Sequence, residues 1–439
     1  MFVPAELRQA VSGEAWLAAL LESEQALARA GADAGIVPGV AAAAIASACV
    51  VEGYAWDDLL EGGRDSGTPV EPLVRAIVTR VGEEHSRFVH LGATSQDVMD
   101  TAAMLVSRHA LRIVLADLSR VAAAAADLAR RHRDTPMVAR TLLQQAVPTT
   151  FGLKAAGWLV AVLDAGARLV AIRDRRLAAQ LGGAAGTLAA FGDAAVEVSD
   201  HYARGLGLGE ATIPWHTNRV RVAELGAALE IAAGVVAKVA LDLELLAQTE
   251  VGEVREGGAG GGSSAMPHKR NPVSAIRARA SAALVGGHAS VLSAAFVGEH
   301  ERAAGAWQAE WEALSGALAF TGGAAAALAD ALENLDVDSE RMRANLVMTG
   351  GQVATERVAT LLTERLGRAA ARDLVREASL RAASSGNPLA DALAELDTGL
   401  TREEIDAALD PTTYVGAAGA LVDRALARYE AEADDMVAE

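Results

Sequence analysis

Two long segments of the sequence carry apolar residues at alternating spacings of three and four positions. The first segment contains Leu111, Val114, Leu118, Val121, Ala125 and Leu128, and the second contains Val222, Leu225, Leu229, Ala232, Val236, Val239, Leu243 and Leu246. This spacing aligns the apolar side chains along one face of an α-helix, and a helix of about 30 residues is roughly 45 Å long. So long an apolar stripe must be covered by partner helices over its whole length. The pattern therefore predicts a bundle of long helices.

Shorter helical patterns flank this central region. Two more bundle helices are expected at about 150–177 and after Pro272, whereas both ends of the chain are richer in turns. We therefore predict an all-α protein whose bundle is flanked by two smaller helical domains. The predicted parts are an N-terminal helical domain at 1–103, a central long-helix bundle with a catalytic loop at 104–350 and a C-terminal small helical domain at 351–439.

Composition narrows the range of partners. Of the 439 residues, 51% are hydrophobic, so the chain can bury a large core. The formal net charge is −18, which argues against nucleic acid as a partner. An anionic substrate must then be gathered by local cations. The single cysteine, Cys49, excludes an internal disulfide and offers no cluster for a structural metal.

The sequence contains no segment that predicts targeting or membrane insertion. The N-terminus lacks the basic region and apolar stretch of a secretory signal. The most apolar runs, 40–51 and 282–297, are short or interrupted by His288, and they are rich in alanine rather than leucine. We expect a cytoplasmic protein that does not enter a membrane.

The stretch 257–272 carries the most chemical information. Five glycines in the six positions 257–262 are followed by two serines, a lysine and an asparagine. From the residues alone this could be a solvated linker. The pair Met266-Pro267 inside the polar stretch, and the return of a helical pattern after Pro272, favour a functional loop. Its hydroxyl, ammonium and amide groups suit the stabilisation of an anionic, carbanion-like intermediate.

The stretch 262–272, GSSAMPHKRNP, resembles the G-S-S-x-M-P-x-K-x-N-P signature of the fumarase/aspartase superfamily. The stretch 90–97, HLGATSQD, resembles the H-x-G-x-T-S-x-D element of the same superfamily, although its residues would also suit an ordinary helix cap. A third stretch, ARTLLQQAVPTTFG at 139–152, is similar to G-R-T-H-x-Q-x-A-x-P-T-T-F-G. Because Pro148 prevents helix continuation, we expect Arg140 to Gln145 to be extended or irregular.

The resemblance implies the L-aspartase-like fold and a set of site residues. By resemblance, Ser263 carries the proton and Lys269 stabilises its alkoxide, and we expect neither a metal nor an organic cofactor. The substrate-binding residues that it implies are His90, Thr94, Ser95, Gln96, Arg140, Thr141, Gln144, Asn271 and Arg302. His216 and His268 are further candidates, but each could equally be a structural hydrogen-bonding residue. The resemblance also implies a homotetramer in which three subunits share each active site.

Two positions depart from the superfamily pattern. Leu142 stands where most members have histidine, and Ile276 stands where that histidine's glutamate partner would fall. Histidine is the usual proton donor near neutral pH, so a reaction without it should involve a weakly basic group. A carboxylate qualifies, because its conjugate acid has a pKa of about 4. This points to the lactonisation of 3-carboxymuconate, a small tricarboxylate whose own carboxylate adds to a double bond, and to the cycloisomerases of the superfamily.

Two alternative functions remain open. A lyase that expels another weak base, such as nitrite from nitrosuccinate, satisfies the same argument, whereas an adenylosuccinate- or argininosuccinate-type lyase fits poorly. A noncatalytic structural oligomer is disfavoured because Ser263, Lys269 and Asn271 are all present. Turnover by the purified protein and identification of the product distinguish these possibilities.

We predict that Leu142→His does not raise the rate of lactonisation. The oxygen nucleophile arrives already ionised, and a histidine packed against Ile276 would bury an unpartnered polar group at a cost of about 1–3 kcal/mol. The measurement is the turnover of 3-carboxymuconate by the variant and the unmodified protein. A clear gain in rate would show that protonation at oxygen matters, and would remove the reason for preferring a lactonising enzyme over an amine lyase.

Overall fold

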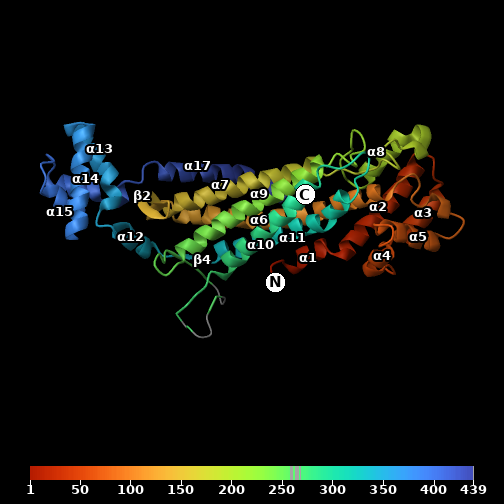
Figure 1. Ribbon diagram of the computed structural model, residues 1–439, viewed down its shortest axis with the longest axis horizontal. Helices are drawn as coiled ribbons and strands as arrows, with labels where there is room; N and C mark the ends of the chain where they lie inside the picture. The colour runs from red at the N-terminus through yellow and green to blue at the C-terminus, as the bar shows by residue number, and fades with distance from the viewer. Residues whose placement is uncertain (258–260, 263–265, 267, 439) are drawn as a thin grey trace.

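The central architecture is an elongated bundle of long helices that lie side by side (Figure 1). The computed structural model describes residues 1–257, 261–262, 266 and 268–438. The bundle helices are α6 (Ser95–Arg131), α7 (Phe151–Arg175), α9 (Val220–Leu246), α10 (Val273–Ala294) and α11 (Ala306–Glu333). The predicted bundle and the all-α class are therefore confirmed.

Helix α6 is the longest element of the described chain, with 37 residues. Its start is fixed by a reciprocal cap, in which the backbone N–H of Thr94 donates to the Asp97 carboxylate at 3.1 Å. The apolar stripe that begins at Leu111 is fully buried through Leu128. At 1.5 Å per residue the helix is about 55 Å long. Its two ends therefore lie at opposite ends of the bundle.

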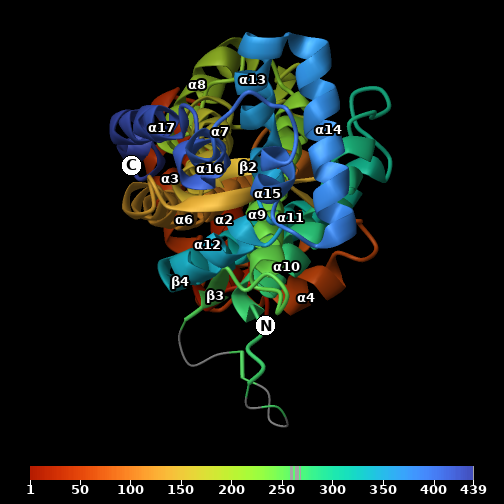
Figure 2. The same cartoon turned by 90° about the vertical axis from the view of Figure 1, so that its left-hand side faces the viewer.

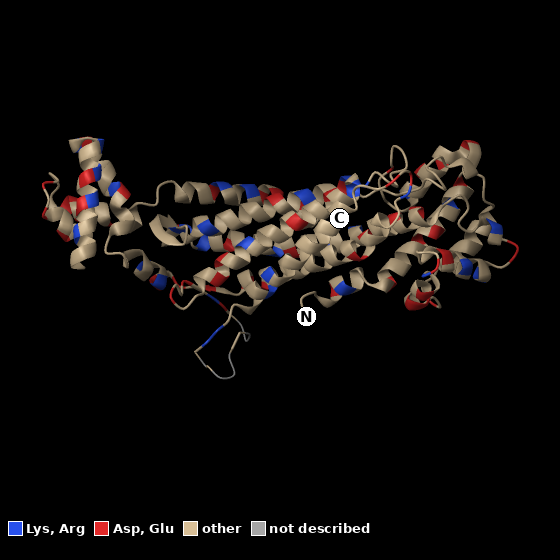
Figure 3. Cartoon of the chain, viewed as in Figure 1, with Lys and Arg blue, Asp and Glu red and all other residues tan. Residues whose placement is uncertain are grey.

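Small side chains let the bundle helices approach closely. Apart from the exposed Asp330, the half of α11 from Gly322 to Leu332 is buried and consists largely of alanine and glycine. Charged residues are sparse along much of the bundle (Figure 3). Two helices, α7 and α11, are long and apolar enough to span a membrane, but 56% and 72% of their apolar windows are buried inside the protein. Their composition is thus that of core helices.

The N-terminal region packs against one end of the bundle, where Figure 1 places α2 to α5 and α8 together. Helix α2 contacts both α6 and α8. The elements of the N-terminal region are α1 (Ala5–Ala10), α2 (Gly13–Asp33), α3 (Gly39–Ala48), α4 (Trp56–Gly62), α5 (Val70–Val81) and η1 (Ser86–Phe88). Two later elements, η2 (Ala189–Ala194) and α8 (Ala195–Gly205), pack with them. Because α6 already begins at Ser95, the bundle starts nine residues before the boundary predicted at 104.

The segment between α6 and α7 is a β-hairpin, which agrees with the extended one of the two conformations expected for Arg140 to Gln145. Strands β1 (Pro136–Thr141) and β2 (Gln144–Thr150) pair antiparallel, with Thr141 opposite Gln144. Leu142 and Leu143 form the two-residue turn, with φ of 50° and 65°. A second small sheet joins β3 (Val254–Glu256) to β4 (Leu335–Val337). The prediction of an all-α chain therefore holds for the class, with two short strand pairs added in the described part.

The C-terminal region divides into two parts. A small cluster with its own core, from Val358 to Ala408, stands beyond the end of the bundle and faces the viewer in Figure 2. Helix α17 instead returns to pack on α7, and Val422 belongs to the main core. The last helix of the segment predicted as one C-terminal domain, 351–439, therefore packs with the bundle rather than with the small cluster. The elements are α12 (Ser339–Val347), η3 (Gln352–Ala354), α13 (Thr355–Leu366), α14 (Arg368–Ser385), α15 (Leu389–Ala394), α16 (Arg402–Leu409), η4 (Pro411–Thr413), α17 (Ala418–Glu432) and η5 (Ala433–Met436).

Gly152, in the first turn of α7, is predicted to be essential for the base of the hairpin. A Cβ at this position would lie 2.6 Å from both the Cα of Arg133 and the carbonyl oxygen of His132, and backbone atoms cannot move aside as a side chain can. We expect Gly152→Ala to lower the free energy of unfolding by about 1–3 kcal/mol. Gly205→Ala is the matched control, because a Cβ there meets open space. Thermal unfolding at one protein concentration measures both, and equal melting temperatures would contradict the prediction.

Candidate active site

The predicted site residues fall into three separate regions of the chain. The first, which we call the amino-end cluster, surrounds Thr94 to Asp97 at the start of α6. The second is the hairpin, which follows the other end of α6, and Figure 1 shows β2 and α8 at opposite ends of the bundle. The third is the glycine-rich loop between β3 and α10. Since α6 is about 55 Å long, the first two regions cannot meet around one small molecule within one chain.

Arg302 and Gln96 are in contact in the amino-end cluster. The Nη1 of Arg302 donates to Oε1 of Gln96 at 2.9 Å, and its Nη2 donates to the carbonyl oxygen of Gly183. The amide nitrogen of Gln96 donates to Asp100 at 3.1 Å and to the carbonyl oxygen of His216 at 2.8 Å. Gln96 is buried, so within one chain its amide orders the cluster. Arg302, which is 24% exposed, is the more accessible of the two.

Asp97 ties the start of α6 to a neighbouring loop. Its carboxylate accepts from the backbone N–H groups of Gly182 and Gly183 at 3.1 and 2.8 Å, and from the amide of Gln180 at 3.1 Å. The side chain is completely buried. Burial raises the pKa of Asp97, and Arg302 and these donors oppose that rise. Asp97 is therefore a structural anchor for residues beside the cluster.

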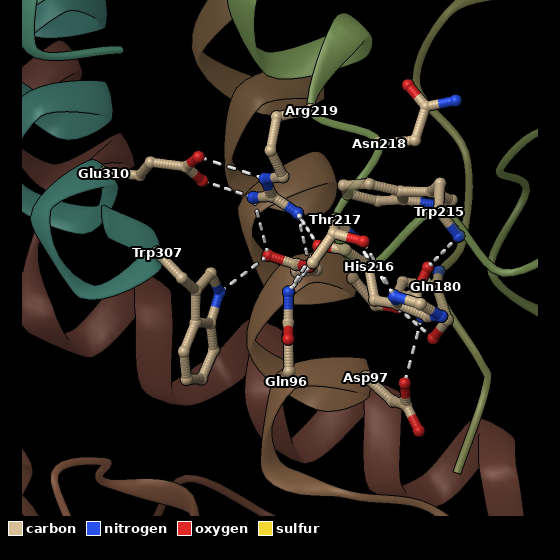
Figure 4. Close-up of polar contacts among 12 residues, drawn as sticks. Gln96, Asp97, Gln180, Trp215, His216, Thr217, Asn218, Arg219, Trp307 and Glu310 are labelled. Atoms are coloured by element: carbon tan, nitrogen blue, oxygen red, sulfur yellow. Dashed lines mark hydrogen bonds and ion pairs between the residues drawn. The ribbon is translucent and has the colours of Figure 1, made fainter. Parts of the chain in front are cut away.

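A buried ionic network lies directly behind this cluster. Arg219, 3% exposed, donates to both carboxylate oxygens of Asp100, at 2.7 and 3.0 Å, and to Glu310 (Figure 4). The indole of Trp307 donates to Asp100 at 3.0 Å. Burial raises the pKa of Glu310 to about 7. Sequence reasoning missed Asp100, Arg219 and Glu310; the available signal was charged residues within otherwise apolar helix faces.

Two histidines flank the cluster in different states. His90, at φ 55°, contacts the buried carboxylate of Glu24 through Nδ1 at 2.5 Å. The Nδ1 of His216 accepts from the backbone N–H of Thr217 at 3.1 Å. Burial, followed by the charge of Arg302, lowers the pKa of His216. His216 is thus a neutral ring near pH 7, with its proton on Nε2. Thr94 and Ser95, the other candidate residues of this cluster, are half-buried at the start of α6.

In the hairpin region, Arg140 already has a partner. Its Nη1 and Nη2 donate to the two oxygens of Glu253 at 2.8 and 2.7 Å, and Glu253 is fully buried. The amide of Asn345 also donates to Glu253 at 2.8 Å. The arginine expected to bind substrate is therefore half of an ion pair that fixes the hairpin to the base of β3. Thr141 and Gln144 are exposed on the last rung of the hairpin.

The tip of the hairpin is uncovered by the described chain. Leu142 is 96% exposed and Leu143 is 79% exposed. Ile276, in the first turn of α10, is 48% exposed. A single chain therefore does not bring Leu142 against Ile276, and the contact expected between them stays a prediction for the assembled site.

The glycine-rich loop is described only in part. Ser263, the expected proton carrier, lies outside the described residues. Both the backbone N–H and the side-chain amide of Asn271 donate to the carbonyl oxygen of Gly261, at 2.9 and 3.2 Å. Glu256 caps α10 by accepting from the backbone N–H groups of Ser274 and Ala275. Lys269, like its neighbour His268, is exposed, so its ammonium is accessible from outside the chain.

No group of three or more metal-ligating side chains occurs in the part of the chain that the structure describes. The charged groups brought together at the amino-end cluster are instead paired carboxylates and guanidinium groups. Such a set orders hydroxyl, amide and cationic groups for an anionic organic molecule.

Comparisons with known proteins identify the class. The family model described as "Lyase" matches residues 6–287, and the model "Adenylosuccinate lyase C-terminus" matches 351–425. The chain is 48% identical over 433 residues to nitrosuccinate lyase of Streptomyces davaonensis, covering 95% of this chain and 91% of that protein. It is 44% identical over 438 residues to 3-carboxy-cis,cis-muconate cycloisomerase of Bradyrhizobium diazoefficiens, covering 98% and 97%.

A solved structure agrees with these relatives. The 3-carboxy-cis,cis-muconate lactonizing enzyme from Pseudomonas putida superimposes with a TM-score of 0.92 at 41% identity, covering 100% of this chain and 98% of that one. The chain therefore belongs to the fumarase/aspartase superfamily, and it is a lyase-type enzyme of that superfamily.

We predict that the Arg140–Glu253 pair holds the hairpin in place. Glu253→Gln removes the charge from a buried acceptor of three hydrogen bonds, and should lower the free energy of unfolding by about 1.5–3 kcal/mol and also lower activity. Arg255→Gln is the control, because it breaks an exposed pair between β3 and Asp336 of β4, two positions along the chain from Glu253, and such a pair contributes about 0–1 kcal/mol. Urea unfolding of both variants measures the difference. Similar losses in the two would show that the buried pair contributes no more than a surface contact.

Proposed function

We propose that the protein is a 3-carboxy-cis,cis-muconate cycloisomerase, which closes 3-carboxymuconate to 4-carboxymuconolactone in protocatechuate catabolism. The observation that carries this proposal is the hairpin tip, where two exposed leucines stand in place of a proton-donating side chain. Addition of the substrate's own carboxylate to a double bond needs no acid at oxygen. Relatives and solved structures with this printed name, at up to 44% identity, add support.

The proposed chemistry balances as an isomerisation with uptake of one proton. One substrate carboxylate forms the new carbon–oxygen bond, and the electron pair of the double bond moves into an aci-carboxylate. Ser263 then delivers a proton to carbon and is reprotonated from water. A serine hydroxyl is a weak acid, so Lys269 and loop N–H groups stabilise the alkoxide that forms. Neither a metal nor an organic cofactor takes part.

The proposed substrate contacts come from all three regions. Thr94 and Ser95 bind one carboxylate at the start of α6, where the helix dipole favours an anion. Arg302 and Lys269 supply cations, and Asn271 positions the substrate. Thr141 and Gln144 contribute from the hairpin tip. Gln96 and Arg140 act through the contacts described above, by holding Arg302 and the hairpin in place.

These contacts require more than one copy of the chain. Because α6 keeps the hairpin about 55 Å from the amino-end cluster, we propose a homotetramer in which three subunits build each site. The exposed residues Ile231, Leu241 and Leu284 on α9 and α10 give such an assembly an apolar surface. The enzyme would act on a small tricarboxylate in the cytoplasm, without nucleic acid or membrane partners.

Nitrosuccinate lyase is the second candidate, favoured by the 48% identity to the Streptomyces davaonensis protein. Nitrite is also a weak base, so its expulsion tolerates the same apolar hairpin tip. Incubation with each substrate separates the two functions. Loss of 3-carboxymuconate absorbance with formation of a lactone supports the cycloisomerase, whereas release of nitrite and fumarate from nitrosuccinate would replace it with the lyase.

We predict that Ser263→Ala lowers turnover by several orders of magnitude while leaving assembly and substrate binding nearly intact, because the hydroxyl acts only in the transition state. Ser264→Ala is the matched control and should have a smaller effect. Steady-state kinetics give the rates, and light scattering gives the mass, expected to be that of four 45.1 kDa chains. Full activity of Ser263→Ala would overturn the mechanism, and a monomer would overturn the shared site.

A further inference from the structure

Glu24 is a buried carboxylate in the middle of α2, and the proposed chemistry does not use it. Its side chain is completely buried, and its Oε1 lies 2.5 Å from Nδ1 of His90. The second oxygen, Oε2, has no hydrogen-bond partner among the described residues. A buried carboxylate with one unsatisfied oxygen is costly unless a nearby cation compensates it. His90 is the group in position to do so.

The backbone around His90 is held in a strained conformation. His90 has a φ of 55°, in the left-handed region that side-chain-bearing residues seldom occupy. Two residues later, Gly92 has no room for a Cβ, which would lie 2.5 Å from the ring of Phe191. Such strain costs about 1–3 kcal/mol and persists where the surroundings fix it, often at functional sites. The turn therefore fixes the His90 ring against α2, four residues before Thr94.

The groups that face this pair favour a charged imidazole ring. Burial alone would lower the pKa of His90, but the charge and hydrogen bond of Glu24, with a further contribution from Asp97 on α6, raise it overall. The other titratable groups near Glu24 are neutral: burial raises the pKa of Cys49 to about 12, and it raises the pKa of Tyr202 as well. Glu24 and Asp97 thus favour the charged, imidazolium form of His90.

We propose that Glu24 is a positioning residue that holds His90 as a fixed cation beside the start of α6, where His90 meets a carboxylate of the substrate. The His90 side chain remains 17% exposed, so the pair is not sealed from solvent. With Nδ1 donating to Glu24, the second N–H of the ring, at Nε2, is the one directed to an anion. The substrate contact rests on the proposed function, whereas the Glu24–His90 pairing does not.

The pairing is tested by NMR on the full-length protein without substrate. The chain has nine histidines, so labelling of the ring Cε1 atoms gives few signals, and His90→Gln identifies the one from His90. We expect this signal to titrate above an ordinary histidine and to move down by at least one pH unit in Glu24→Gln. In Glu24→Asp, which keeps the charge, the His90 signal should titrate at a pH between those of the unmodified protein and Glu24→Gln. This variant replaces Glu24→Gln in the test if Glu24→Gln does not fold. Identical titration in all three would overturn the pairing.

The matched control is Ser23→Ala. Ser23 neighbours Glu24 on α2, is equally buried and hydrogen-bonds Tyr202. Its removal should lower the melting temperature and leave the His90 titration unchanged. A shift as large as that of Glu24→Gln would mean that the titration reports general loosening of α2, and would also overturn the pairing.

The substrate contact is tested by the pH dependence of kcat/KM with 3-carboxymuconate. His90 is active when protonated, so activity is full at low pH and falls as pH rises through its raised pKa. In Glu24→Gln the fall should move to lower pH by the amount seen by NMR, with the change mainly in KM, about tenfold per pH unit above the pKa. If Glu24→Gln lowers kcat/KM by the same factor at every pH and leaves the pH of the fall unchanged, the proposed substrate contact is wrong. If the unmodified protein turns over neither this substrate nor nitrosuccinate, the proposed function fails, while the NMR result still decides the pairing.

Discussion

The rigidity and length of α6 are the constraint on which the rest of the structure depends. One unbroken helix of 37 residues carries Thr94 and Ser95 at its start and delivers the chain to the hairpin at its end. The proposed substrate contacts therefore come from regions about 55 Å apart in one chain. The N-terminal region and the C-terminal cluster then occupy opposite ends of the bundle (Figures 1 and 2), where each lies next to one of these regions. A site built from all three regions, as proposed, thus needs more than one copy of the chain.

Buried charges fix these parts in position more than they stabilise the fold. Placing Asp100, Arg219 and Glu310 out of water costs free energy that their attraction only partly returns, and an apolar replacement of similar volume is often as stable. The network nevertheless fixes the side-chain orientation of Gln96, which in turn holds the Arg302 side chain by a hydrogen bond. The pair of Arg140 and Glu253 does the same for the hairpin. Two of the three regions of the proposed site, the amino-end cluster and the hairpin, are thus supported by ionic contacts behind them.

Sequence reasoning found the elements that follow local rules and missed those that depend on distant partners. The three-four spacing predicted the bundle, and the polar stretch 90–97 was recognised as suited to a helix cap, although the predicted boundary at 104 lies nine residues inside α6. The sequence allowed an extended segment here but did not predict the hairpin turn, because the turn places two leucines at positive φ, where asparagine and glycine are the usual signal. Nor could the sequence show that Arg140 pairs with a residue 113 positions away. The sequence pointed to Arg140 and Gln96 as site residues, but it could not distinguish side chains that bind substrate from side chains that hold other residues in position.

The hairpin tip links this architecture to the chemistry. Two leucines in the left-handed region cost about 1–2 kcal/mol each, and both expose apolar surface to water. The described chain covers neither side chain, and in the proposed tetramer another copy supplies the compensating contacts. In a shared site this tip brings an apolar surface to a substrate that cations elsewhere hold by its carboxylates. A reaction whose oxygen nucleophile is already ionised tolerates such a surface, whereas expulsion of an amine or hydroxide needs a proton donor in the same place. The same two residues therefore connect the need for a second copy of the chain with the class of group that the enzyme can add or expel.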